Sequence, residues 1–162
     1  MSHRQAIAQQ WMEEALNEAK LAQSKGEVPI GAIVVHRGST ISRAHNLVES
    51  LNDATAHAEI LALRKAASAL GRWRLQDCSL IVTLEPCSMC LAAARLSRID
   101  EIIFGALDER FGSVGRPRDL SKDPLWGPTP RLLGGVCSDK SLELMQSFFK
   151  ELRGRSKNSP SE

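Results

Sequence analysis

Four residues in two short segments could together bind a metal ion and move protons. His57 and Glu59 stand two residues apart, and Cys87 and Cys90 stand three apart, directly after Pro86. Cysteines at this spacing at the start of a helix can face one point, and the helix N-terminus favours the thiolate form that binds zinc. One imidazole and two thiolates make a three-ligand site, whereas a structural zinc site normally has four protein ligands. The pattern therefore predicts a zinc ion with an open fourth position.

The other two cysteines are the alternatives for a fourth ligand. Cys78 precedes the strand that leads to Cys87, so it should lie about a strand length away, at the opposite end of the sheet. Cys137 follows an apolar stretch and fits the core, although this argument does not exclude it as a ligand. Because the sequence shows no export signal, we expect free thiols or metal ligands in place of disulfides.

Glu59 has two possible roles. On an ideal helix, residues two apart point about 200° away from each other, so Glu59 and His57 share a site only if His57 lies where the helix begins. Asp53 or Thr55 could cap such a helix. A glutamate on the helix surface is the ordinary role. Beside a zinc-bound water, whose pKa falls toward about 7, a carboxylate can instead take and return a proton. With the cysteines present, we favour the catalytic role.

Hydrophobic periodicity predicts elements that bring the two segments together. A helix over residues 56–70 travels about 22 Å, and a strand over residues 79–84 returns about as far, so Cys87 comes back beside His57. Helices are also predicted over residues 5–24 and 87–96 and around Leu142, Met145, Phe149 and Leu152. Further strands are predicted over residues 30–35, 40–46, 101–105 and 131–136, the first two as a hairpin. This alternation indicates an α/β fold, a three-layer α/β/α sandwich around a mixed five-stranded sheet.

Length and composition are those of one folded domain. The 162 residues are 43% hydrophobic and 25% charged, close to the globular average. The longest apolar run covers residues 89–94, whereas a membrane span needs about 18 residues. The N-terminus lacks the apolar core of a signal peptide, so we expect a cytoplasmic protein. We predict one domain over residues 1–153 and a disordered tail over 154–162, which contains no apolar residue.

Two segments are more basic than the net charge of +2 suggests. Residues 110–131 and residues 150–157 each carry a local charge of +3. Either segment could face phosphate groups, although short basic stretches more often serve only solubility. The first segment largely coincides with a proline-rich stretch, residues 111–130, whose length is typical of a functional or mobile loop.

The sequence resembles the zinc nucleobase deaminases, which carry His-x-Glu and Pro-Cys-x-x-Cys motifs. Within them it is similar to the bacterial tRNA-specific adenosine deaminases over residues 8–153. The matching segments are Gly-Glu-Val-Pro-Ile-Gly-Ala (26–32), His45-Asn46, Thr-Ala-His-Ala-Glu-Ile (55–60), Thr-Leu-Glu-Pro-Cys-Ser-Met-Cys (83–90), Phe-Gly-Ala (104–106) and Phe148-Phe149.

The resemblance implies a cytidine-deaminase-like fold, a homodimer and one zinc ion per chain, held by His57, Cys87 and Cys90. The implied reaction is hydrolytic conversion of the wobble adenosine in a tRNA anticodon stem-loop to inosine, with Glu59 as the proton shuttle. It implies neither a membrane nor a DNA partner. The residues implied to hold the flipped base are Asn46 and the Ala58 backbone, with a pocket shaped by Val28, Ile30 and Leu84, and with Phe149 available for stacking. For the four apolar side chains, the ordinary alternative is core packing.

The sequence departs from the family mainly in the proline-rich loop. The family usually has Lys at Arg110, a Gly-Ser pair at Gly115-Arg116 and an Asn-His pair within residues 126–130. It also has Pro at Ala54 and Cys soon after Glu143. Substrate contacts from the loop therefore stay open. Two other functions also remain: a small-molecule deaminase acting on guanine, cytosine or a nucleoside, and a non-catalytic RNA-binding or structural zinc module.

Overall fold

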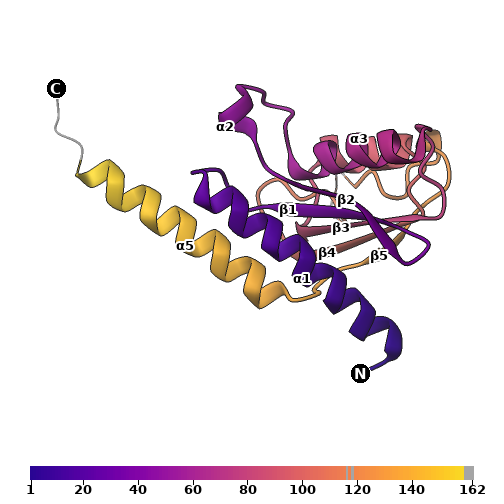
Figure 1. The fold of residues 1–162 in the computed structure, drawn as a ribbon, viewed down its shortest axis with the longest axis horizontal. Coiled ribbons are helices and arrows are strands. Elements are labelled where there is room, and N and C mark those ends of the chain that lie inside the picture. Colours follow the sequence, from indigo (N-terminus) through magenta and orange to yellow (C-terminus); the bar gives the residue numbers. More distant parts are fainter. Residues whose placement is uncertain (116, 118, 159–162) are drawn as a thin grey trace.

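The fold is built on a single five-stranded sheet (Figure 1). The computed structural model describes residues 1–115, 117 and 119–158. The strand order is β2-β1-β3-β4-β5. The strands are β1 (Gly31–His36), β2 (Ser39–His45), β3 (Cys78–Leu84), β4 (Glu101–Ala106) and β5 (Arg131–Leu133). Strand β1 pairs antiparallel with β2 and β3, whereas β3, β4 and β5 run parallel, so the predicted mixed sheet with its hairpin is confirmed.

Helices cover both faces of the sheet. They are α1 (His3–Ser24), α2 (Val48–Leu51), α3 (Ala58–Leu70), α4 (Ser88–Leu96) and α5 (Ser138–Lys157), with a 3₁₀ turn η1 (Pro124–Trp126). Alternate strand residues face opposite ways, as the strand period of two requires. Ile33, Ile81 and Ile103 pack with α1 and α5, while Val34 and Leu80 pack with α3 and α4. The predicted three-layer α/β/α sandwich is thus confirmed (Figure 1).

The ends of two elements and one short helix differ from the sequence prediction. The strand predicted over residues 131–136 ends at Leu133, because a side chain on Gly134 would lie 2.4 Å from the Phe104 ring and Gly135 has a φ of +83°. Helix α5 extends to Lys157, into the segment predicted as a tail, and basic residues in its last turn suit the negative end of the helix dipole. Residues 159–162 of that predicted tail lie outside the described residues. The short helix α2 was not predicted.

No helix within the described ranges is long and apolar enough to cross a membrane.

Candidate active site

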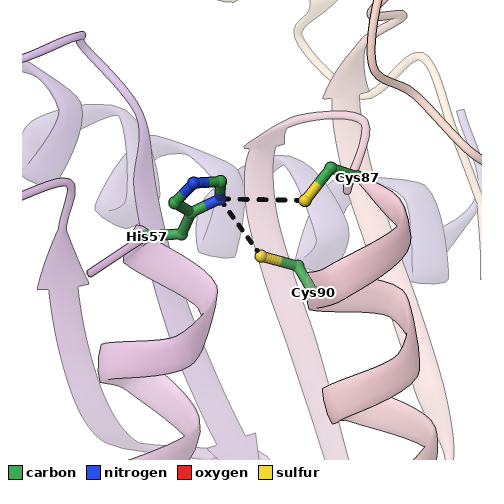
Figure 2. Close-up of side chains that lie close together, drawn as sticks. All are labelled: His57, Cys87 and Cys90. Carbon is green, nitrogen blue, oxygen red and sulfur yellow. Dashed lines mark hydrogen bonds between the residues drawn. The ribbon is translucent and has the colours of Figure 1, made fainter. Parts of the chain in front are cut away.

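Three predicted metal ligands meet where α3 and α4 begin (Figure 2). His57 is the N-cap of α3 and Cys87 is the N-cap of α4, and neither side chain makes a capping hydrogen bond. Both side chains instead point toward each other, with His57 Nδ1 lying 3.8 Å from Cys87 Sγ and 3.4 Å from Cys90 Sγ. The predicted return of Cys87 to His57 is therefore confirmed.

The spacing of these atoms fits a zinc ion. Zinc bonds of about 2.3 Å to sulfur and 2.1 Å to nitrogen, at a tetrahedral angle, place the two ligand atoms about 3.6 Å apart. The two observed distances, 3.8 and 3.4 Å, lie on either side of this value. Cys78 lies buried at the start of β3, at the other end of that strand, and Cys137 is the N-cap of α5. Among the residues that the structure describes, no fourth ligand joins the cluster, so one coordination position is open to a water or substrate.

The protonation of the cluster favours a single thiolate in the absence of metal. A hydrogen bond from Cys90 lowers the pKa of Cys87 to about 4, with a further contribution from His57. The same hydrogen bond and burial raise the pKa of Cys90. The pKa of His57 is raised as well, chiefly by its hydrogen bond to Cys87. Zinc binding must therefore displace protons from the site.

Glu59 lies beside the ligands in the first turn of α3. The residue is 4% exposed, and burial raises the pKa of its carboxyl group, although a hydrogen bond from Cys90 acts in the opposite direction. Because His57 is the N-cap of α3, the two side chains share one site, as the catalytic interpretation requires. The suggested cap by Asp53 or Thr55 is wrong: Asp53 accepts hydrogen bonds from the Thr55 backbone and hydroxyl, at 2.8 and 2.7 Å, in the turn before the helix. A buried carboxyl group with a raised pKa holds a proton more readily than an ordinary glutamate does, as a proton shuttle requires.

Two adjoining cavities open beside the ligand cluster. Their volumes are about 410 and 470 Å³, and His57 contributes to the walls of both. All six residues expected to contact the base line one or both cavities: Val28, Ile30, Asn46, Ala58, Leu84 and Phe149. Glu59 and Cys87 line the second cavity. The structure therefore brings every predicted site residue together. The two cavities together make up the cleft.

Phe149 takes part in the cleft and is not simply a core residue. Its side chain is 39% exposed, and its ring lies 5.3 Å from the Phe148 ring in an edge-to-face arrangement. Met145 and Leu152 of α5 line the cleft with it. The helical spacing of these residues predicted an amphipathic helix, but that signal does not distinguish a face packed on the sheet from one that borders a cavity.

Several residues of the cleft were missed in the sequence. Glu27 and Glu85 are buried glutamates, 0% and 2% exposed, and each lines one cavity. Asp108 and Phe111 line the second cavity. Glu27 and Glu85 stand inside the segments that resemble the deaminases, which was the available signal, but nothing local marks a glutamate as buried.

The two basic segments are placed differently. Arg110 lines the second cavity, while Arg131 lies on β5 with its Nε 3.9 Å from Glu101. Arg116 and Arg118 lie outside the described residues. All four basic residues of segment 150–157 are exposed in the last turns of α5. A phosphate-binding role is therefore compatible with Arg110 and with the end of α5.

Known proteins are similar to this chain in both sequence and structure. Residues 5–106 match the cytidine and deoxycytidylate deaminase zinc-binding region. The chain is 44% identical over 147 residues to the tRNA-specific adenosine deaminase of Bacillus subtilis (strain 168), covering 91% of each chain. A solved tRNA A34 deaminase, studied for A-to-I editing at the wobble position, aligns with a TM-score of 0.80 and 42% identity, over 83% of this chain and 98% of that one. A guanine deaminase from Nitrosomonas europaea aligns with a TM-score of 0.76 and 25% identity, over 86% and 83%.

Proposed function

The chain belongs to the family with the cytidine and deoxycytidylate deaminase zinc-binding region, and we propose that it converts the wobble adenosine of a tRNA anticodon to inosine. The reaction consumes one water and releases ammonia. The observation that carries this proposal is the cluster of three side chains that could bind a metal ion, His57, Cys87 and Cys90, with the buried Glu59 beside them in the wall of the cleft. The relatives with 44% and 42% identity that act on tRNA favour this substrate.

His57, Cys87 and Cys90 would hold one zinc ion per chain. When bound, zinc supplies a Lewis acid that lowers the pKa of a coordinated water toward about 7. The imidazole and thiolates are the ligand types that zinc prefers, and their spacing fits it.

Glu59 would move the protons of the reaction. It would take one proton from the water as the water oxygen bonds to C6, and a second from the hydroxyl group this forms on C6. It would deliver one of these protons to the adenine ring nitrogen and the other to the amino group, which leaves as ammonia when its bond to C6 breaks. Its burial keeps the carboxyl group away from bulk water, and its raised pKa suits a group that must both accept and donate.

The cleft would hold the flipped base. Val28, Ile30 and Leu84 offer apolar contacts, and Phe149 offers an aromatic ring on which a base can stack. Hydrogen-bonding groups are offered by the Asn46 side chain and by the backbone of Ala58, which lies in the first turn of α3. An anticodon base is already unpaired, so it can turn into the cleft at a low cost in free energy.

Three further properties belong to this proposal. The RNA partner is an anticodon stem-loop, whose phosphates would lie against basic side chains. The resemblance to the tRNA deaminases supports a homodimer and a cytoplasmic location, where tRNA is modified. Neither a membrane nor DNA is needed for the activity.

The test is to compare substrates with the zinc-loaded protein. Inosine formation is measured in an anticodon stem-loop with adenosine at the wobble position, beside deamination of free guanine, cytosine and adenosine. We expect turnover of the RNA and little of the free compounds. Efficient turnover of guanine or another free compound, without reaction on the RNA, would replace this proposal by a small-molecule deaminase, the activity of the 25% identical guanine deaminase.

A further inference from the structure

The loop over residues 108–114 is fastened to the segment that carries Cys87. Glu85 accepts a hydrogen bond from the Asp108 backbone at 3.3 Å and another from the Val114 backbone at 3.2 Å, one on each carboxylate oxygen. Ser113 donates from both its backbone N–H and its hydroxyl to the Pro86 carbonyl, at 3.2 and 3.1 Å. Both ends of the loop are therefore held beside the metal ligands.

Gly112 shows how closely this loop approaches its anchor. A Cβ atom at this position would lie 2.0 Å from a carboxylate oxygen of Glu85, and Gly112 forms an isolated β-bridge with Cys87. The residue before it, Phe111, is consequently presented at a fixed place in the wall of the cleft.

Phe111 is a large aromatic side chain left open to solvent at this place. It is 61% exposed, yet it lines the same cavity as Glu59 and Cys87. The Arg110 guanidinium lies 5.2 Å from the centre of its ring, within range of a cation–π contact. A single exposed apolar residue is common on protein surfaces, but this one borders the reacting groups and carries a cation beside it.

We propose that Phe111 is a stacking platform for the unpaired nucleobase next to the base that reacts. This inference rests on the proposed function, because it requires an RNA substrate. Aromatic rings bind unpaired bases of any sequence by stacking, and the neighbouring Arg110 suits the phosphate that joins the two nucleotides. A free base or nucleoside has no neighbour to stack, so Phe111 contributes to turnover of RNA only.

The first experiment compares Phe111→Ala and Phe111→Trp with the parent protein on an anticodon stem-loop. Phe111→Ala should lower kcat/KM by about 5- to 150-fold, the loss of one stacked base contact, and Phe111→Trp should keep most of the parent value. Trp73→Ala is the matched control. Trp73 is 55% exposed with the Arg74 guanidinium 4.3 Å from its ring, but it follows the far end of α3, about 20 Å along the helix from His57. Zinc content and melting temperature are measured for each protein.

The second experiment removes the partner base. Stem-loops are made with an abasic residue directly 5′ or directly 3′ of the reacting adenosine. On one of these two RNAs, kcat/KM of the parent protein should fall by the same factor as kcat/KM of Phe111→Ala falls on intact RNA. On that same abasic RNA, Phe111→Ala should show no further fall in kcat/KM. If Phe111→Ala lowered kcat/KM relative to the parent protein by the same factor on intact RNA and on both abasic RNAs, the stacking role would be overturned. An equal fall in kcat/KM for Trp73→Ala on intact RNA would overturn it as well. If the parent protein does not act on the RNA at all, the proposed function itself fails, and this inference falls with it.

Discussion

Glu59 is the one side chain of the site assigned both to take up and to release protons. Its burial and its raised pKa separate it from an ordinary helix-surface glutamate, and its place two residues after the N-cap His57 keeps it beside the ligands. A carboxylate beside the three metal-binding side chains has a second possible role, as a fourth ligand. The two roles differ in what happens to the metal when the carboxylate is removed.

Glu59→Gln should therefore stop turnover and leave zinc in place. The amide has nearly the same shape but cannot accept the proton, so kcat should fall by at least about 10²- to 10⁴-fold, the usual contribution of a general acid–base group. Single-turnover inosine formation and metal analysis of the same sample measure both effects. Loss of zinc from Glu59→Gln would make Glu59 a fourth ligand and revive the structural-site interpretation.

The ligand assignment makes a separate prediction about metal content and pH. Cys87→Ser and Cys90→Ser should lose zinc, whereas Cys137→Ser should keep it, because Cys137 lies outside the cluster. Since the pKa values of Cys90 and His57 are raised, zinc must displace protons from both, so zinc affinity should rise as pH increases. Competition with a chelator at about pH 6 and about pH 8 measures the change. A pH-independent affinity, or full zinc content in both serine variants, would contradict the assignment.

The walls of the cleft depend on contacts between elements that are distant in the sequence. Glu27, just before β1, accepts hydrogen bonds from the backbones of Glu49 and Ser50, each at 2.9 Å, and from the Ser50 hydroxyl at 2.8 Å. It thereby joins the wall that carries Val28 to the short helix α2, which follows Asn46. Burial alone would raise the pKa of Glu27, but the hydrogen bonds from Ser50 and Glu49 outweigh it and lower the pKa.

Glu27→Gln should destabilise the fold in a pH-dependent way. At neutral pH, an amide cannot accept all three hydrogen bonds, and the unsatisfied partners should cost about 1–3 kcal/mol of unfolding free energy. Because the folded pKa is lowered, the stabilisation by the carboxylate is complete above its unfolded pKa of about 4.3 and is lost as pH falls through the folded pKa. Urea unfolding at several pH values should show that the unfolding free energies of the parent protein and Glu27→Gln become equal in acid. Glu143→Gln is the control, because Glu143 is exposed. If the unfolding free energies of the parent protein and Glu27→Gln differed by the same amount at all pH values, the ionised carboxylate would be excluded as the cause.

The lengths of two elements were enough to predict the metal site. Helix α3 leads away from His57 and strand β3 returns over about the same distance, so Cys87 must lie near His57. The six residues proposed to contact the base came from family resemblance. Neither route could find the anchoring roles of Glu27 and Glu85, since burial of a glutamate depends on backbone donors 22 to 29 residues away. The early end of β5 was missed for a similar reason: the close approach of Gly134 to the Phe104 ring depends on tertiary packing.

Helix α5 connects the cleft to the basic surface of the molecule. Phe149 and Leu152 line the cleft, while Lys150 and Arg153 are exposed on the same turns. Figure 1 shows the C-terminal end of α5 extending beyond the sheet. An RNA loop with one base in the cleft would thus place neighbouring phosphates near these cations, and a free nucleoside would not reach them.

The double variant Lys150→Ala/Arg153→Ala should therefore weaken RNA binding and reduce its dependence on salt. Each phosphate contact contributes a slope of about −0.7 to −0.9 to the plot of log affinity against log salt concentration, so losing two contacts should flatten the slope by about 1 to 2. Binding of an anticodon stem-loop is measured with Glu59→Gln, which prevents turnover. Arg37→Ala is the control, because Arg37 is also exposed but follows the end of β1 farthest from the cleft and pairs with Asp77. An unchanged slope would place the RNA phosphates elsewhere and leave the zinc chemistry intact.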